Sequence, residues 1–331
     1  MLDAGSQKQP LEPHSRQAYG VRASSIPASI VKLPASAPNR RSPRVKTTLA
    51  LLLLTALTLL TASRCYPSGT RVVIFVQGIY TTYDASGTQA TVPEGQRFNV
   101  IKNYFIAKGY ERSALLDFSY AGGAVRSDGT WTPQPYTCDQ TDRFAADNLT
   151  PLEQMLRDYG KAHKNTHFTL VGHSLGGYLS FLEGALEAQR SDSDKLGIDA
   201  VVTIDAPLQG ADADKKVILD LVPCDKTYRA GAEIVAQKLD PDTPELRRAQ
   251  TDAMAQQGIR LATLGNMWDC LWNTGHCLPG GTWVDDSGTQ FLPGASISNA
   301  YTIASGALFS HDAILADATA MHDAVTFVGA P

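Results

Sequence analysis

A serine flanked by glycines lies where an apolar segment meets a helix-forming one. Residues 172–177 read Gly-His-Ser-Leu-Gly-Gly, after the apolar residues 168–171. A Gly-x-Ser-x-Gly pattern between a strand and a helix is typical of a tight turn that presents a nucleophilic serine. Side chains two residues before and two after that serine would collide, so glycine is expected at both places. Ser174 is therefore the predicted nucleophile, at a helix start that favours developing negative charge.

A serine nucleophile requires a base to accept its proton and an acid to orient that base. In folds with this kind of turn, the chain order is serine, then the acid, then histidine. Among the seven histidines, His311 follows the last predicted strand and begins the terminal helix. A loop at that place can direct the imidazole ring toward Ser174. His311 is therefore the predicted base.

The acid has more than one candidate. Asp269 lies shortly after the apolar strand predicted at 259–264, where the acid is usually carried. Asp205 ends the preceding predicted strand and is the alternative. Asp285 and Asp286 are further candidates. Chain position favours Asp269 over Asp205.

Acyl transfer also requires two backbone donors for the oxyanion. The N–H group of Leu175, directly after the serine, is one predicted donor. The other is expected in the turn after the first buried strand, where Gly78 allows close approach of the backbone. Ile79 is the predicted donor in that turn.

The elements that position these residues alternate along the chain. The predicted strands are 71–77, 114–119, 168–171, 198–204, 259–264 and 300–304, and the predicted helices are 94–108, 142–162, 175–189 and 311–328. This alternation predicts an α/β fold with a doubly wound, mostly parallel sheet. Residues 120–140 are predicted as a loop. The stretch between Pro207 and Ile259 exceeds one crossover, which predicts a small helical cap insertion at about 208–258.

The N-terminal part differs from the rest in composition. Residues 1–46 are rich in Pro, Ser, Ala and Arg without an apolar period, which predicts a disordered basic leader. Residues 47–64 are predicted as the h-region of a signal peptide, with a membrane anchor through 47–62 as the alternative. Either predicts that the body, residues 65–331, is secreted or lies at the cell surface.

Charge is distributed unevenly between these parts. The chain has a formal net charge of −4, but residues 1–46 carry eight Lys or Arg against two acidic residues. The remainder carries 21 Lys or Arg against 31 Asp or Glu. An acidic body argues against nucleic acid as a partner.

Five cysteines fit an oxidising compartment. Cys270 and Cys277 are close in sequence, which predicts a local disulfide. Cys138 and Cys224 are the predicted second pair, and Cys65 is left over. The predicted alternative is that some of these are buried thiols.

Several motifs together resemble one known family. The run 172–177, the strand followed by Gln77-Gly78, the segment 203–210 (Thr-Ile-Asp-Ala-Pro-Leu-Gln-Gly) and the tail Ser310-His311-Asp312 are similar to the lipase/esterase branch of the α/β-hydrolase superfamily. The resemblance covers roughly residues 70–329. One departure is that this branch commonly has His-Gly where this chain has Gln77-Gly78.

The resemblance implies an α/β-hydrolase fold and hydrolysis of carboxylic esters without a cofactor. The expected partner is an ester or lipid substrate, which allows transient contact with a lipid interface. An acyltransferase or thioesterase with the same triad, or an inactive binding protein with the hydrolase fold, are the alternatives. No metal site is predicted, since His276 with Asp285 and Asp286 forms only a weak pattern.

Overall fold

The computed structural model describes residues 69–83, 98–211, 229–267, 288–303 and 310–331. All of them belong to one compact unit, Tyr66–Pro331. The leader 1–46 and the segment 47–64 lie outside these residues, as do four of the five cysteines, so the anchor, export and disulfide predictions stay predictions. Among the described helices, none has the length and apolar character needed to span a membrane.

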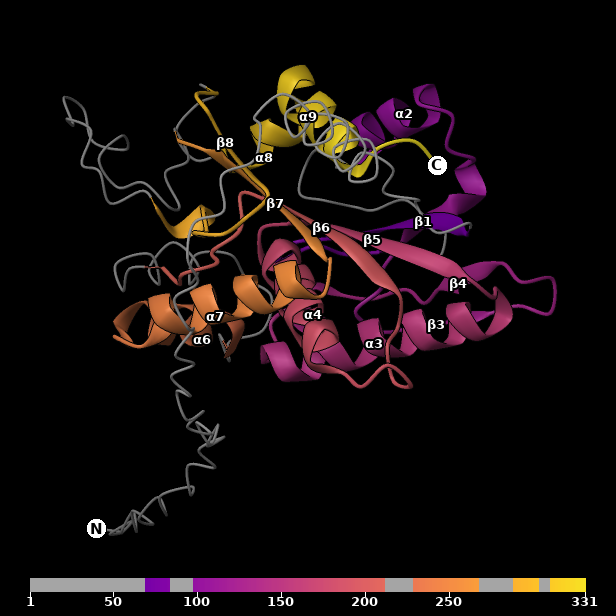
Figure 1. Ribbon diagram of the computed structural model, residues 1–331, viewed down its shortest axis with the longest axis horizontal. Helices are drawn as coiled ribbons and strands as arrows, with labels where there is room; N and C mark the ends of the chain where they lie inside the picture. Colours follow the sequence, from indigo (N-terminus) through magenta and orange to yellow (C-terminus); the bar gives the residue numbers. More distant parts are fainter. Residues whose placement is uncertain (1–68, 84–97, 212–228, 268–287, 304–309) are drawn as a thin grey trace, which may run out of the picture. The chain divides into compact units, whose positions relative to one another are not determined.

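A six-stranded parallel sheet forms the centre of the unit (Figure 1). Its order is β2-β1-β5-β6-β7-β8. The strands are β1 Thr70–Val76, β2 Leu115–Asp117, β5 Thr166–His173, β6 Ile198–Ile204, β7 Arg260–Asn266 and β8 Ile297–Tyr301. Every neighbouring pair is parallel. The predicted doubly wound parallel sheet is confirmed.

The apolar run of β1 shows why the sheet is covered on both faces. Val72, Ile74 and Val76 belong to one hydrophobic cluster, whereas Val73 and Phe75 belong to another. Successive side chains of a strand point to opposite faces, so a strand without polar alternation must be buried on both sides. The continuous apolar segment at 71–77 therefore predicts the central position that β1 occupies.

Helices form a layer on each face of this sheet, as Figure 1 shows. Helices α2 (Asn99–Ala107) and α9 (Ala318–Val328) pack together on one face. Helices α3 (Ala145–Ala162), α4 (Leu175–Gln189) and α7 (Thr243–Gln256) cover the other. This three-layer arrangement, with the serine turn between β5 and α4, is that of an α/β-hydrolase core.

The predicted cap insertion contains two helices in its described part. Helix α6 (Arg229–Leu239) comes first, and α7 then packs against α4 and β7 as the crossover between β6 and β7. Residues 212–228, the remainder of the insertion, lie outside the described residues.

The prediction of a loop at 120–140 was wrong in part. This stretch contains an antiparallel hairpin of β3 (Gly123–Val125) and β4 (Trp131–Pro133). Its turn is closed by Asp128, whose carboxylate accepts the N–H of Thr130 at 2.9 Å. Strands of three residues are too short to show an alternating pattern, so the turn residues dominate the sequence signal.

The C-terminal elements also differ from the prediction. Strand β8 ends at Tyr301, not 304, and the Tyr301 hydroxyl donates to Asp323 of α9 at 2.8 Å. The helix predicted at 311–328 is divided into α8 (Ser310–Ala313), a 3₁₀ turn and α9. Asp317 adopts an extended backbone conformation and caps α9 by accepting the N–H of Ala320 at 2.8 Å. An internal aspartate that can cap a helix therefore restarts it.

Candidate active site

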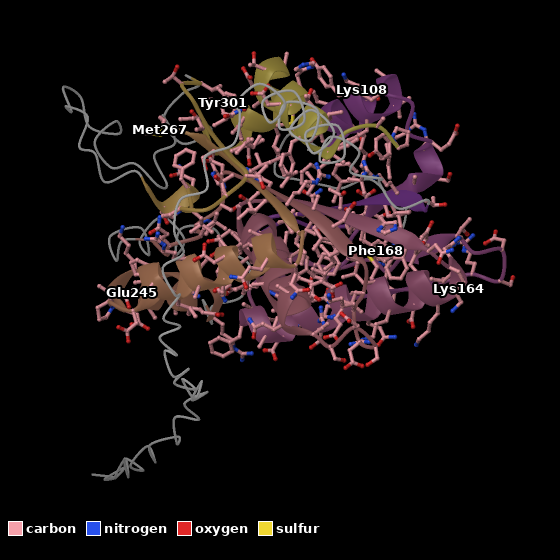
Figure 2. The ribbon with its side chains drawn as sticks, viewed as in Figure 1. Lys108, Lys164, Phe168, Glu245, Met267 and Tyr301 are labelled. Atoms are coloured by element: carbon pink, nitrogen blue, oxygen red, sulfur yellow. The ribbon has the colours of Figure 1, made fainter. Side chains whose placement is uncertain are left out.

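The segments that carry the predicted site residues meet at one edge of the sheet. Ser174 follows β5, Asp205 follows β6, and His311 lies after β8. Figure 2 labels Met267 and Tyr301 at this carboxyl edge, whereas Lys164, just before β5, lies at the opposite edge. Loops at the carboxyl edge of a parallel sheet are the usual place for a site in such folds.

Ser174 occupies the sharp turn between β5 and α4. Its backbone has φ 56° and ψ −129°, a conformation that costs energy for any residue with a Cβ. The turn is fixed on both sides: the N–H of Ser174 donates to Ile204 at 2.9 Å, and its carbonyl accepts from Gly177 and Tyr178. The serine is 6% exposed, so its hydroxyl lies in a recess at the start of a helix.

Two glycines make this turn sterically feasible. A Cβ atom at Gly172 would lie 2.2 Å from the carbonyl oxygen of Gly176. A Cβ atom at Gly176 would lie 2.1 Å from the carbonyl oxygen of Val76. Both distances are far below van der Waals contact, so the spacing of glycines around Ser174 follows from backbone packing and not only from flexibility.

The turn after β1 lies directly against the serine. A Cβ atom at Gly78 would lie 2.8 Å from Cβ of Ser174. The turn is held by its neighbours: the hydroxyl of Tyr120 donates to the Gln77 carbonyl at 2.6 Å, and the N–H of Tyr80 donates to Thr141 Oγ1 at 2.8 Å. Ile79, the predicted oxyanion donor, therefore lies in a fixed turn and directly follows Gly78, the residue that lies against Ser174.

Leu175, the other predicted donor, is the first residue of α4. The first N–H groups of a helix have no carbonyl acceptor within the helix. The Leu175 N–H therefore belongs to a set of donors that can act on an anion at the helix start.

His311 pairs with Asp205. Its Nδ1 lies 3.2 Å from Oδ2 of Asp205, and both residues are buried. An ionised carboxylate only accepts hydrogen bonds, so this contact places a proton on Nδ1 and makes Nε2 the basic nitrogen. This is the tautomer that a histidine base requires.

His173 links the histidine segment to the serine turn. Its Nε2 lies 3.0 Å from the carbonyl oxygen of His311, and the two rings lie 4.5 Å apart. Because His173 directly precedes Ser174, these contacts hold His311 beside the turn. In the sequence, His173 occupies only the variable position of the Gly-x-Ser-x-Gly motif, so the motif gives it no role.

Two residues that belong to no sequence motif, Asn266 and Gln290, hold Asp205. The backbone N–H of Asn266 donates to Oδ1 of Asp205 at 3.0 Å, and Gln290 Nε2 lies 3.1 Å from the same oxygen. The main chain of Asp205 has φ 49°, and its N–H donates to Leu264 at 2.7 Å. Hydrogen bonds to a buried carboxylate favour its ionised form.

The structure thus brings together Ser174, Leu175, Ile79, Asp205 and His311 at one edge. Asp269, the acid that chain position favoured, lies outside the described residues, and the described partner of His311 is Asp205.

The other acid candidates, Asp285 and Asp286, and the weak metal pattern with His276 also lie outside the described part of the chain. Within that part, no group of three or more metal-binding side chains is found. A cavity of about 760 Å³ is lined by Thr70, Trp131 and His163 at the other end of β1 and does not include Ser174.

No protein-family model and no curated protein matches the chain. Solved structures do match. The product of the gene lin2722 from Listeria innocua is 14% identical, with 78% of this chain and 94% of that one covered and a TM-score of 0.47. The metagenome-derived lipolytic enzymes LipS and LipT are represented by a match at 11% identity, with 78% and 94% covered and a TM-score of 0.45.

Phospholipase PlaB from Legionella pneumophila is also similar, at 13% identity and a TM-score of 0.40. The match covers 60% of this chain and 39% of PlaB, so the chain spans about two fifths of that protein. At such identities and scores, these similarities establish no chemistry for this chain.

Proposed function

We propose that the protein is a serine hydrolase that cleaves carboxylic esters. Ser174 is the nucleophile, His311 the base and Asp205 the acid. The observation that carries the proposal is the strained turn at Ser174 beside the buried His311–Asp205 pair, whose contact is 3.2 Å. A conformation this costly is retained where function requires the serine side chain to project from a sharp strand-to-helix turn.

The proposed reaction has two stages. His311 Nε2 accepts the proton of the Ser174 hydroxyl while Oγ attacks the ester carbonyl carbon, and the N–H groups of Leu175 and Ile79 hold the oxyanion. The ester C–O bond breaks, and the alcohol leaves with the proton from His311. Water, deprotonated by His311, then attacks the acyl-enzyme and releases the acid with Ser174 restored.

Asp205 replaces Asp269 as the acid in this proposal. Strand β6 lies directly beside β5 in the sheet, whereas β7 is one strand further away. A carboxylate at the end of β6 is therefore close to the serine turn, and its Oδ2 is within hydrogen-bond distance of the histidine ring. Its backbone strain and its two further donors support a role that requires one fixed orientation.

The proposal includes secretion or display at the cell surface. The basic residues before the uncharged segment 47–62 support export. N-terminal sequencing of the protein from the medium and from washed membranes tests this. A mature chain that starts near residue 65 supports cleavage, and an intact Met1 in the cytosolic fraction argues against export.

The activity is tested by comparing wild type with Ser174→Ala on p-nitrophenyl esters of increasing chain length. We expect Ser174→Ala to lower kcat on the order of 10⁴-fold or more, as in other triads. Ser180→Ala is the matched control, because Ser180 is also buried in α4 but its hydroxyl donates to the Gly176 carbonyl at 2.7 Å. Wild-type rates in Ser174→Ala would reject the proposal. Adding an alcohol acceptor distinguishes acyl transfer from hydrolysis.

A further inference from the structure

Gln290 contacts the proposed acid from a distant part of the chain. It ends the 3₁₀ turn Gly288–Gln290, which is 85 residues after Asp205, and it is fully buried. Its Nε2 lies 3.1 Å from Oδ1 of Asp205 and 3.5 Å from the carbonyl oxygen of Asn266. One amide therefore faces both the carboxylate and the end of the neighbouring strand β7.

Contacts that do not involve Asp205 fix the segment that carries Gln290. The Thr289 hydroxyl donates to the Gly210 carbonyl. The N–H of Gln209 donates to the Thr289 carbonyl at 3.1 Å, and Gln209 Nε2 donates to the Phe291 carbonyl at 2.7 Å. The segment 289–291 is thus anchored to the loop after β6 by three hydrogen bonds that do not involve Asp205, and two of them do not use the Gln209 side chain.

The amide acts here as a donor. Within the described residues, Oε1 of Gln290 has no hydrogen-bond partner, although it is buried. Burial of a polar atom without a partner costs free energy, so a residue that served packing alone would be apolar. The feature that distinguishes Gln290 from an apolar side chain of similar size is its hydrogen bond to Asp205.

We propose that Gln290 is a positioning residue for Asp205, an inference that rests on the proposed function. Its amide occupies Oδ1, so that Oδ2 faces His311, and it stabilises the ionised carboxylate. The ring of His173 from β5 also faces His311, and Asp312 from α8 lies 4.0 Å from His173 Nε2. Gln290 acts through the acid and not on the substrate.

The first test compares Gln290→Leu with Gln209→Leu. Gln290→Leu removes the donor to Asp205 and keeps the volume, and we expect kcat to fall about 10- to 100-fold with KM within about twofold. Gln209→Leu loosens the same segment by removing the bond to Phe291 but leaves the donor to Asp205. The folded fraction of Gln209→Leu should keep the wild-type kcat. If Gln290→Leu does not fold, Gln290→Met is measured in its place.

The second test is the pH profile of kcat/KM for Gln290→Leu. Without the amide donor the ionised Asp205 is less stabilised, and the Asp205–His311 pair binds a proton more readily, so the acidic limb should move to higher pH. A role in packing alone would not move this limb.

The results separate the two proposals. Ester hydrolysis that disappears in Ser174→Ala establishes the function independently of Gln290. With that activity present, an unchanged kcat in Gln290→Leu, an equal loss in Gln209→Leu, or an unmoved acidic limb in Gln290→Leu overturns the positioning role.

Discussion

Two buried carboxylates, Glu187 and Asp205, lie near opposite ends of β6 and have different partners. Glu187 lies in the last turn of α4, close to the start of β6, and Asp205 directly follows the end of β6. Both accept backbone N–H groups. Their remaining partners differ, and that difference separates a structural carboxylate from a catalytic one.

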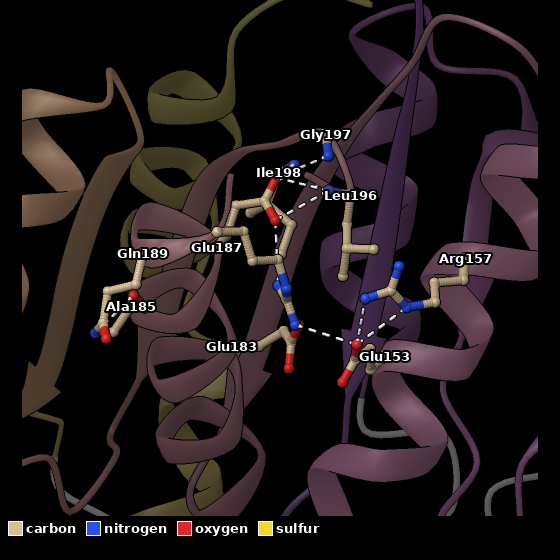
Figure 3. A network of polar contacts seen from close by, with 10 residues as sticks. Glu153, Arg157, Glu183, Ala185, Glu187, Gln189, Leu196, Gly197 and Ile198 are labelled. Carbon is tan, nitrogen blue, oxygen red and sulfur yellow. Dashed lines mark hydrogen bonds and ion pairs between the residues drawn. The ribbon is translucent and has the colours of Figure 1, made fainter. Parts of the chain in front are cut away.

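Glu187 binds groups whose charge does not change near neutral pH. Its carboxylate accepts the N–H groups of Leu196, Gly197 and Ile198 at 2.8–3.3 Å and pairs with Arg190 at 3.1 Å (Figure 3). Backbone amides and a guanidinium keep their protons. Glu187 therefore fixes the loop that leads into β6.

Asp205 pairs instead with the imidazole of His311, a group that can accept and release a proton. Its backbone is strained, and its other oxygen is occupied by Asn266 and Gln290. The same carboxylate chemistry thus stabilises the fold at one end of β6 and orients a proton acceptor at the other.

Asp205→Asn should cause the largest loss of activity. The variant keeps the size of the side chain but can hold His311 in the wrong tautomer, so we expect kcat/KM to fall about 10⁴-fold. The thermal midpoint should change by no more than a few degrees. Activity within about tenfold of wild type would contradict this assignment, and Asp269→Asn in parallel would then show whether the other candidate carries the role.

Gly78→Ala tests the turn that faces Ser174. Its new Cβ would lie 2.8 Å from the serine Cβ, so the turn must shift away from the reaction centre. We expect kcat to fall about 10²-fold through loss of one oxyanion donor, with KM little changed. Stopped-flow acylation with an activated ester measures this step. An unchanged acylation rate would contradict a role for the turn after β1 in holding the oxyanion.

Glu187→Ala should lower the stability of the fold and leave the activity of the folded protein unchanged. It leaves three N–H groups of the loop before β6 without their acceptor and Arg190 without one of its partners. We expect unfolding to be easier by about 3 kcal/mol in urea titrations, with kcat of the folded protein unchanged. A large loss of kcat with unchanged stability would contradict the assignment of a structural role to Glu187 and a catalytic role to Asp205.

Glu183 gives the smallest effect, on the pH dependence of stability. Burial raises the pKa of its carboxyl group to about 7, against the opposing effect of Arg190 at 2.8 Å. Between about pH 4.5 and 7, the folded state keeps the proton on Glu183, whereas the unfolded chain releases it. The free energy of unfolding therefore falls as the pH rises through this interval. Glu183→Gln cannot ionise, so its stability relative to wild type should rise across this interval. A constant difference between pH 5 and 8 would contradict this.

The features that depend on local sequence could be predicted. The Gly-x-Ser-x-Gly pattern identifies the turn at Ser174 by its local sequence, and the continuous apolar strands predict a sheet buried on both faces. His311 could be chosen because one histidine combined a late position with a helix start. In each case the decisive signal lies in a few neighbouring residues or in the periodicity of one element.

The features that depend on which strand ends meet could not be predicted. Asp205 and Asp269 each follow a buried strand, and their order in the chain does not say which one faces His311. No local sequence motif identifies Gln290, because its proposed role depends on a hydrogen bond to a carboxylate 85 residues away in the chain. The β3–β4 hairpin was missed because its strands are too short to show a period.

Labelling with a fluorophosphonate probe tests the central claim most directly, because the probe reacts rapidly with a serine that is activated by a neighbouring base. Intact mass and peptide mapping of the wild-type protein should show one adduct, on Ser174. Labelling should be absent in Ser174→Ala and strongly slowed in Asp205→Asn. An unlabelled wild-type protein, or an adduct that persists in Ser174→Ala, would contradict the account.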